Sequence, residues 1–541
     1  MLQVRQMGAV GIITDVEPFD LPPNGVSRGV NIRFSDNKIG KAPAHRLVDT
    51  LLDSSATTVT PLESAWLYSY LYPGSADTIG IIESSGRIFH WQNATLTEVT
   101  QVGFSGSAST IPFTQCLLAG VSYVNRSNMI PQRFLPTDTD YDDLENWTSD
   151  WRCRVFRAFK DYPIALDVTK GANRYPTMIK WGNAAEYGAV STSWDHTDPT
   201  NNAGENTPGD ATSAWLDGLA LRNAFVMYND TQVYAMTESL DFEVFNVRKL
   251  FDDRGIINTN CVVAVNNMHY VFDRQDIYVH DGVQHRSICD GRVRKFIFDS
   301  IDFGAKDAFF VSHNPRLKEI KFFYRSGDEL VGFSGGTKCN RSAVYNYISD
   351  TWSFYDHPNI VGSCVVGIST FTTWDDMESG WDVTGGTWYE QESTSSKNEV
   401  LLGLHATDVI TDSRLYGFDP IEGGLLPYPI DEDATLDGIA YRTGLDMDDQ
   451  GEEIRAYKVI KALYPQIDDF GNGGVYLKFA GMLYSASIPS WETEQNFVPL
   501  TNHKVDTRAG GRYLGWYLRC TATTDFRFAG FDADIVTTGR R

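Results

Sequence analysis

Short runs in which apolar and polar residues alternate occur throughout the chain, whereas long runs with helical periodicity are rare. Residues 261–280 show the pattern best: CVVAV, MHYVF and DIYVH are separated by NN and DRQ, and Asp281 and Gly282 follow. Alternation with a period of two indicates strands, and gaps of two or three turn-forming residues indicate hairpins. The pattern therefore predicts an antiparallel meander, the unit from which a propeller blade is built.

A related strand end recurs along the chain: an aliphatic residue, then Phe or Tyr, then any residue, then an aromatic residue or His. Copies occur at 277–280, 344–347 and 415–418, and a copy with slipped spacing occurs at 88–91. The intervals are irregular, which argues against a consensus repeat array. The segment 335–352, in which paired glycines precede Tyr and Trp, is similar to a Kelch blade. We predict an all-β fold built on an irregular β-propeller with long insertions; unrelated hairpins are the alternative.

The chain divides into three predicted regions. Residues 1–60 supply strands of a platform or strands that close the ring, and residues 61–425 form the degenerate propeller. The polar segment 183–213, rich in Pro, Gly and Asn, interrupts the propeller as an insertion loop, and its length suggests an interface arm. Residues 426–541 contain longer alternating strands and are predicted to form an additional C-terminal β-sheet unit.

Helices are expected to be few and short. The best helical candidate is the segment 291–301, GRVRKFIFDSI. Apolar runs stay well short of eighteen residues, so we expect no insertion into a membrane. The N-terminal stretch has no long apolar core and is not predicted to be a secretory signal.

The overall charge limits the classes of partner. The chain has 541 residues, a net charge of -24 and a pI of about 4.8. A protein that grips nucleic acid through its phosphates normally carries a basic patch, so such a grip is not expected. Contact with DNA that slides past without adhering remains compatible with this charge, and solubility alone is the simpler explanation.

The chain carries few signals of cofactor or metal chemistry. Its seven cysteines are widely spaced and form no C-x-x-C pair, which argues against a disulfide framework or a zinc site and favours buried free thiols. Walker A, G-x-G-x-x-G and H-E-x-x-H motifs are absent from the sequence. We therefore expect no cofactor, no metal and no catalytic residues.

Acidic residues gather in the segment 431–453, where Arg442 is the single basic residue. Nine carboxylates in so short a span repel one another, so they must face water, a partner or a channel. Calcium is a weaker alternative, because the segment resembles a calcium loop only loosely. The candidate channel-lining residues are Asp431, Glu432, Asp433, Asp437, Asp446, Asp448, Asp449, Glu452 and Glu453.

Four stretches, taken in order, resemble a family of virion proteins of short-tailed bacteriophages, the tail nozzle or tail tubular protein B (DNA-stabilisation) type. The first is residues 11–44, with the signature Arg28-Gly-Val-Asn31-Ile-Arg33-Phe. The second is residues 151–183 together with the polar segment that follows. The third begins at DIYVHDG and ends at KFIF, and the fourth is the C-terminal FAGFDADIVTTGRR.

The resemblance implies a structural protein of the tail that is made in the cytoplasm of the bacterial host. It would form a homo-oligomeric ring, typically a hexamer, at the distal end of the tail. The ring would bind the head-to-tail adaptor ring, anchor tail fibres or spikes, and retain and then conduct the genome during DNA ejection. An acidic lumen would repel phosphate and give double-stranded DNA only transient, non-adhesive contact.

Two other classes of protein stay open from the sequence. A β-propeller glycosidase or depolymerase of the tail would need a pair of carboxylates across a deep cleft. A receptor-binding tail module would more often be an elongated trimer. A nozzle should instead combine an open channel with large interfaces, and it would not be an enzyme.

Overall fold

The structure is a computed structural model that describes residues 2–540, apart from several internal segments. These segments are 54–59, 71–77, 93–94, 240–243, 329–335, 367–397, 407–410, 420–435, 447–455, 470–473, 486, 500 and 522–525. The described chain is almost wholly β-stranded, which confirms the predicted all-β class. Its one α-helix, α1 (Arg294–Ser300), lies inside the segment predicted to be helical, and two 3-10 turns, η1 (Pro18–Asp20) and η2 (Phe303–Ala308), accompany it.

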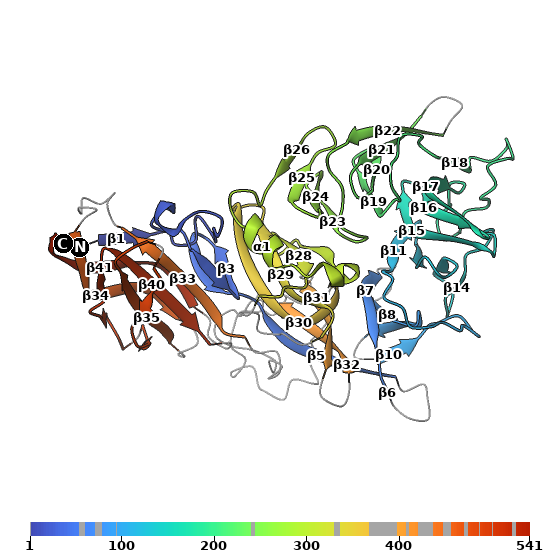
Figure 1. The fold of residues 1–541 in the computed structure, drawn as a ribbon. Coiled ribbons are helices and arrows are strands. Elements are labelled where there is room, and N and C mark those ends of the chain that lie inside the picture. Colours follow the sequence, from blue (N-terminus) through green and yellow to red (C-terminus); the bar gives the residue numbers. More distant parts are fainter. Residues whose placement is uncertain are drawn as a thin grey trace.

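Sets of four consecutive antiparallel strands are arranged as blades around a common centre, as predicted for a propeller (Figure 1). The first blade consists of β7 (Ser64–Tyr70), β8 (Thr78–Glu83), β9 (Ile88–Gln92) and β10 (Thr95–Glu98). The second consists of β11 (Thr114–Leu118), β12 (Val121–Asn125), β13 (Gln132–Phe134) and β14 (Asp142–Asp143). The third consists of β15 (Trp151–Phe159), β16 (Tyr162–Lys170), β17 (Asn173–Trp181) and β18 (Gly204–Asn206).

Three further blades complete the ring. The fourth consists of β19 (Asp217–Leu221), β20 (Ala224–Tyr228), β21 (Val233–Glu238) and β22 (Phe245–Phe251). The fifth consists of β23 (Val262–Val265), β24 (Met268–Phe272), β25 (Ile277–His280) and β26 (His285–Ser287). The sixth consists of β27 (Phe310–Asn314), β28 (Glu319–Tyr324), β29 (Cys339–Asn346) and β30 (Thr351–Val366), and β30 lies against β7 to close the ring.

Local sequence explains the individual blades. The fifth blade has the three strands predicted for residues 261–280, and Asn266 and Asn267 between β23 and β24 both have positive φ, as a two-residue hairpin turn requires. The recurring strand end falls on the third strand of three blades, in β9, β25 and β29. In each of these strands one aromatic ring meets a ring of a neighbouring blade: His90 meets Phe134, His280 meets Tyr228, and Tyr345 meets Tyr270.

The sixth blade continues into a larger sheet. Strand β30 bends at Asn359, which has positive φ, and its second half pairs with β31 (Asn398–Ala406). The sheet then adds β32 (Thr411–Asp419), β5 (Ala44–Asp53) and β6 (Thr60–Pro61). Strands β5 and β32 pair antiparallel, so the chain enters and leaves the propeller along adjacent strands.

Two sheets form the additional unit, which we call the platform. One contains β3 (Ile32–Ser35), β4 (Lys38–Lys41), β41 (Phe526–Arg540), β34 (Ala456–Asp469), β38 (Val505–Asp506), β1 (Leu2–Arg5) and β39 (Gly510–Gly511). The other contains β2 (Arg28–Val30), β33 (Gly438–Leu445), β40 (Tyr513–Cys520), β35 (Val475–Met482), β36 (Ser490–Trp491) and β37 (Gln495–Phe497). Both ends of the described chain lie at the end of the platform that is farthest from the propeller (Figure 1).

The segment 183–213 differs in part from the predicted insertion loop. It contains β18, the outer strand of the third blade, and Trp194 from this segment is buried against Trp147 with ring centroids 4.7 Å apart. The Asn183 side chain organises the segment, since its Nδ2 donates to Thr192 Oγ1 and its Oδ1 accepts from the backbone N–H of Ala203. Sequence periodicity missed this packing because Trp194 is an isolated apolar residue in a polar run. The interface role of the segment stays a prediction.

Separate hydrophobic clusters fill the spaces between neighbouring blades, and one large cluster runs from the platform into the fourth, fifth and sixth blades. Burial of apolar area in these clusters is the main stabilising contribution to the fold. Because the largest cluster crosses from one unit to the other, the platform and the propeller share a continuous core.

Candidate functional site at the platform–propeller junction

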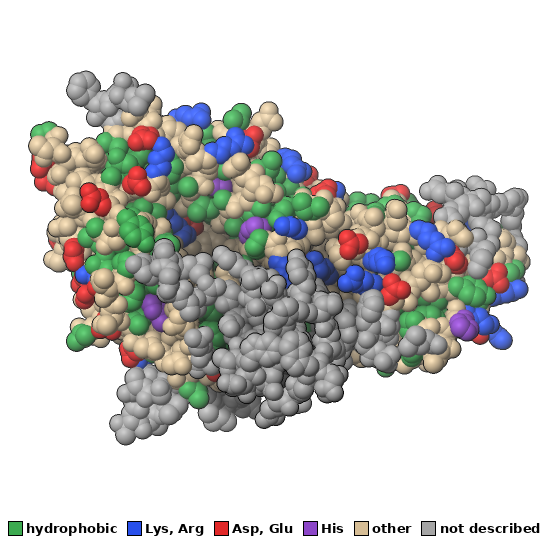
Figure 2. All heavy atoms as spheres, turned by 180° about the vertical axis from the view of Figure 1, so that it is seen from behind, with side chains coloured by type: hydrophobic (Ala, Val, Ile, Leu, Met, Phe, Trp, Pro, Cys, Tyr) green, Lys and Arg blue, Asp and Glu red, His purple; other side chains and the backbone are tan. Residues whose placement is uncertain are grey.

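The structure describes two of the nine candidate acidic residues. The Asp437 carboxylate accepts from Arg519 Nη1 at 2.8 Å, and the backbone carbonyl of Asp446 accepts from Lys458 Nζ. The other seven lie outside the described residues. Figure 2 shows the face of the molecule opposite to that of Figure 1, and acidic and basic side chains are interspersed on its described part. A channel-lining role for the acidic segment stays a prediction.

A single residue turns the chain from one platform sheet into the other and also contacts the propeller. Asn31 lies between β2 and β3 with a φ of 56°, a left-handed conformation that Asn adopts more readily than most residues. Its Oδ1 accepts from the backbone N–H of Asp356 at 2.9 Å, and its Nδ2 donates to the carbonyl of Asp437 at 3.2 Å. The backbone N–H of Asn31 donates to the Phe354 carbonyl at 2.8 Å. Asn31 therefore links β30 of the sixth blade to the platform through its side chain and its backbone.

Replacing Asn31 by glycine is expected to lower the free energy of unfolding by about 1–3 kcal/mol, because the buried N–H of Asp356 loses its side-chain acceptor. Replacing it by alanine should cost about 1 kcal/mol more, since alanine adopts the left-handed conformation less readily than glycine. Urea unfolding of both variants measures these differences. Equal stability of the glycine variant and the wild type would contradict a stabilising role of the Asn31 side chain.

Charged side chains also connect the platform to the sixth blade. Arg28 Nη2 donates to Asp328 Oδ2 at 2.7 Å, and Arg341 Nη1 donates to the same oxygen at 2.8 Å. Arg341 Nε also donates to Asp356 Oδ1 at 2.7 Å. The Arg341 side chain is fully buried; burial alone would lower its pKa, but the adjacent carboxylates outweigh this effect and the pKa is raised. These contacts tie β2 of the platform to β29 and β30.

A second group of charges lies deeper in the sixth blade. Arg33 Nε donates to Glu319 Oε1 at 2.8 Å, and Tyr355 donates its hydroxyl proton to the same oxygen at 3.2 Å. Lys321 Nζ lies 3.9 Å from Glu319 Oε2 and forms an ion pair with Glu399. The Lys321 and Glu399 side chains are both completely buried. Glu399 also accepts from Ser312, Asn314 and Ser363, so its carboxylate is well satisfied.

Two of these ion pairs, Arg28–Asp328 and Arg33–Glu319, cross between the two units, whereas Lys321–Glu399 lies within the sheet of the sixth blade. Taking charges out of water costs about as much as their attraction returns, so such pairs add little to net stability. Their value is geometric, because any displacement of the platform from the sixth blade would leave buried charges uncompensated. Arg28 and Arg33 therefore add directional contacts to the hydrophobic core that the platform and the propeller share.

A hydrogen-bonded row of side chains in the same region contains the residue types of a nucleophilic site, but solvent and substrates do not reach it. Ser342 Oγ lies 2.8 Å from His357 Nε2, and His357 Nδ1 lies 2.9 Å from His45 Nε2. All three side chains are buried, and burial holds the pKa of His357 well below its usual value. A substrate could not reach Ser342, so the row is structural.

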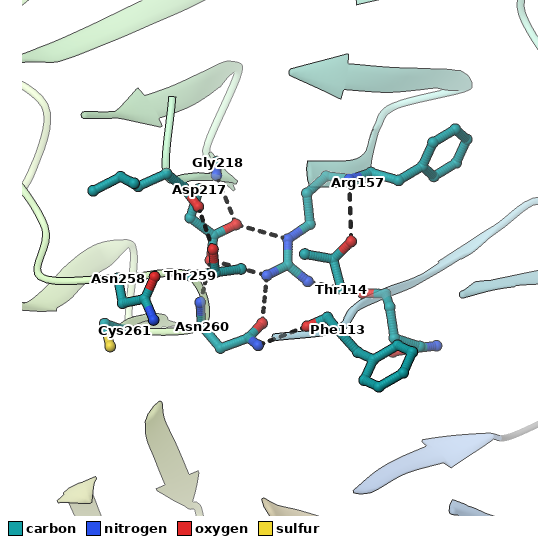
Figure 3. A network of polar contacts seen from close by, with 12 residues as sticks. Phe113, Thr114, Arg157, Asp217, Gly218, Asn258, Thr259, Asn260 and Cys261 are labelled. Carbon is teal, nitrogen blue, oxygen red and sulfur yellow. Dashed lines mark hydrogen bonds and ion pairs between the residues drawn. The ribbon is translucent and has the colours of Figure 1, made fainter. Parts of the chain in front are cut away.

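A second polar network connects four blades at the propeller centre (Figure 3). Arg157 of β15 donates to both carboxylate oxygens of Asp217, at 2.9 Å each, and to Asn260 Oδ1 at 2.8 Å. The backbone N–H of Asn260 donates to Asp217 at 2.7 Å, and its side chain donates to the Phe113 carbonyl at 2.8 Å. Residues from the second to the fifth blade thus meet around one fully buried carboxylate.

Near this network lies a cavity of about 390 Å³, which we call the central hollow. Its lining includes Ser127, Arg154, Asp167, Thr169, Arg174 and Asp307. These residues come from the β12–β13 turn, from β15, β16 and β17 of the third blade, and from η2. Sequence analysis did not select any of them individually, because they are scattered charged or hydroxyl residues without a recognisable motif.

A row of polar side chains also links the fourth and fifth blades. Gly282 N–H donates to His280 Nδ1, so neutral His280 carries its proton on Nε2, 2.7 Å from the Tyr228 hydroxyl. Tyr228 lies 2.6 Å from His269 Nδ1, and His269 Nε2 lies 3.0 Å from the Ala220 carbonyl. Every donor finds one acceptor when both histidines are neutral. Burial lowers the pKa of His269 to about 4 and that of His280 to about 3.

The four stretches of the nozzle resemblance fall on distinct parts of the structure. The first supplies β2, β3 and β4 and, with them, Arg28, Asn31 and Arg33 at the junction. The second forms β15, β16 and β17, which carry Arg157 and most of the central hollow. The third forms β25, β26 and α1, and the fourth forms most of β41.

The described residues contain neither a metal-binding cluster nor a membrane-spanning helix. Among these residues, no group of three or more His, Cys, Asp or Glu side chains is placed to hold a metal ion. No helix in the described part of the chain has the length and apolar character needed to cross a membrane.

Comparison with known proteins adds a likeness of structure alone. Neither a protein-family model nor a curated protein matches the chain. Among 395 matching chains of known structure is the computationally designed Ika8 protein, which is 12% identical and has a TM-score of 0.35. The match covers 69% of this chain and 100% of the designed one. At this identity and TM-score, the likeness supports no argument about function.

Proposed function

We propose that the chain is a structural protein of the tail of a short-tailed bacteriophage, a subunit of the nozzle ring through which the genome leaves the virion. The observation that carries the proposal is the junction. The signature residues Arg28, Asn31 and Arg33 of the resemblance to the nozzle family are the residues that fix the platform to the propeller.

A junction of this kind suits a part that must stay assembled while DNA passes under pressure. The subunit would present a platform and a propeller at a fixed angle, so that identical copies can close into a ring of one size. In this proposal the adaptor ring and the fibres or spikes bind to other surfaces of the same ring. The net charge of -24 on each copy would limit adhesion of the passing DNA.

Exposed apolar side chains on the platform support an interface between copies. The connection between β35 and β36 exposes Leu483, Tyr484 and Ile488, and Ile488 is 93% exposed. Neighbouring apolar side chains that remain in water usually mark a contact with another protein. Within the proposal, this connection packs against a second copy of the chain.

Purified wild-type chain is therefore expected to form a symmetric ring with an open axial channel, seen by negative-stain electron microscopy and sized by mass photometry. The triple substitution L483S, Y484S and I488S should shift the equilibrium toward monomers by roughly a factor of ten or more, because each buried apolar side chain contributes about 1.5–3 kcal/mol to an interface. The substituted residues are exposed in the single chain, so its fold should be unchanged.

A matched control places serine at Val102 and Val283, two exposed apolar positions in propeller connections, 87% and 74% exposed. This variant should assemble like the wild type. A wild-type chain that stays monomeric at every concentration, both alone and with the adaptor ring, would contradict the nozzle proposal.

The enzyme alternative is less well supported by the geometry. The central hollow brings two carboxylates together, Asp167 and Asp307, as a glycosidase would need. Both oxygens of Asp167 already accept hydrogen bonds from Arg174, at 2.8 and 2.6 Å. A carboxylate held in this way is poorly suited to attack a sugar or to transfer a proton. We expect the chain to release no reducing ends from capsular polysaccharide.

A further inference from the structure

The geometry of the central hollow points to a binding site for a small hydroxylated ligand that carries one carboxylate, such as a sugar acid. The cavity, about 390 Å³, lies within the usual size range of small-molecule sites. Binding here does not require a ring, so a failure of this inference would leave the nozzle proposal untouched.

Arg154 in the wall of the hollow has an unused donor. Its Nη2 donates to Asn258 Oδ1 at 3.0 Å, whereas Nη1 makes no hydrogen bond among the described residues and, unlike the buried Nε, stays accessible. No carboxylate of the described chain lies within ion-pair distance of Arg154, in contrast to Arg157 on the same strand, which Asp217 binds with both oxygens. An anionic ligand in the hollow would give Nη1 a charge-assisted hydrogen bond.

A backbone irregularity shapes the wall of the hollow. Asp167 has a φ of 54° at a bulge between Leu166 and Val168, where the register of β16 against β17 shifts. This conformation costs a non-glycine residue about 1–2 kcal/mol. The Asp167 side chain is 1% exposed and holds Arg174 through two guanidinium nitrogens. Arg174 is thereby fixed at the hollow, with its third nitrogen unbonded among the described residues.

The chemistry of the lining defines the ligand class. Arg154 and the free edge of Arg174 can bind one carboxylate, since guanidinium groups match the geometry of a planar oxyanion. Asp307, which accepts from Asn258 at 3.2 Å, would repel a second negative charge but can accept from a ligand hydroxyl. Thr169 and Ser127 add hydroxyl groups that both donate and accept. One carboxylate with several hydroxyls fits this set better than a bare anion.

Calorimetric titration of the full chain tests the site with three probes: glucuronate, glucose and inorganic phosphate. Glucuronate should bind, whereas glucose, which lacks the carboxylate, should bind roughly tenfold more weakly or not measurably. Inorganic phosphate should bind more weakly than glucuronate because it cannot use the hydroxyl-accepting part of the hollow. Phosphate binding as tight as glucuronate binding would overturn the assignment of a hydroxylated ligand.

Variants locate the binding. R154Q should weaken glucuronate binding by roughly tenfold or more, since a charge-assisted hydrogen bond is lost. R248Q, at an exposed arginine of β22, is the matched control and should bind like the wild type. If R154Q does not fold, T169V gives the same test through a lost hydroxyl and should weaken binding several-fold. Absence of glucuronate binding, or binding that R154Q or a folded T169V leaves unchanged, would overturn the inference.

Discussion

Replacing Lys321 by methionine is expected to lower the free energy of unfolding by about 3–5 kcal/mol. The substitution leaves Glu399 as a fully buried carboxylate that keeps its hydrogen bonds from Ser312, Asn314 and Ser363 but loses its ion-pair partner. The remaining negative charge, removed from water and without a cation beside it, is the source of the cost. Urea unfolding at neutral pH measures it.

The double variant K321M and E399Q separates the charge from the packing. Glutamine carries no charge, and its Oε1 can still accept from Ser312 and Ser363, but its amide nitrogen cannot accept from Asn314, so the double variant should recover part of the lost stability. K504M removes the lysine of the exposed pair with Asp506 and should change stability little, because water screens that pair. A loss below about 1 kcal/mol for K321M would contradict the role assigned to the buried pair.

Lowering the pH from about 6.5 to about 4 is expected to destabilise the protein steeply. Burial lowers the pKa of His90 and of His269 to about 4 and that of His280 to about 3. Above pH 6.5 these histidines are neutral in both the folded and the unfolded chain. Between 6.5 and the folded pKa, only the unfolded chain binds the proton, so stability falls by up to about 1.4 kcal/mol per pH unit for each histidine.

The variant H90F isolates one of these contributions. His90 stacks on Tyr70 and meets Phe134 edge to face, and its Nε2 is buried without a hydrogen-bond partner, so phenylalanine suits the site. The difference in unfolding free energy between H90F and the wild type should grow by at most about 1.4 kcal/mol per pH unit as the pH falls from 6.5 to 4. Carboxylates titrate in the same way in both proteins, so their contributions to the unfolding free energy cancel in this difference. A difference independent of pH would contradict the depressed pKa of His90.

Local sequence patterns predicted much of the propeller, since each blade is built from neighbouring strands and short turns. The strands of the fifth blade and the helix α1 lie where alternation and periodicity placed them. The junction could not be predicted in this way. It depends on strands far apart in sequence, such as β2 with β33, and on charges such as Lys321 and Glu399 that resemble surface residues until the fold buries them.

The acidic segment shows the opposite limit. Its composition predicts repulsion between the carboxylates, but it does not predict which way each carboxylate points. In the structure, Asp437 is paired with Arg519. The central hollow was missed for a related reason. The positive φ of Asp167 and the unpaired Nη1 of Arg154 result from three-dimensional packing, and no spacing of residues in the sequence predicts them.

The pairing of β4 with β41, and of β2 with β33, has a consequence for synthesis on the ribosome. Roughly 400 residues separate Lys41 from Gly438, so the first platform strands emerge long before their partners. At about 5–20 residues per second, they wait on the order of half a minute while the propeller is made. A prematurely terminated chain could complete its blades but not its platform, so translation itself would keep unfinished subunits out of any assembly that requires the platform.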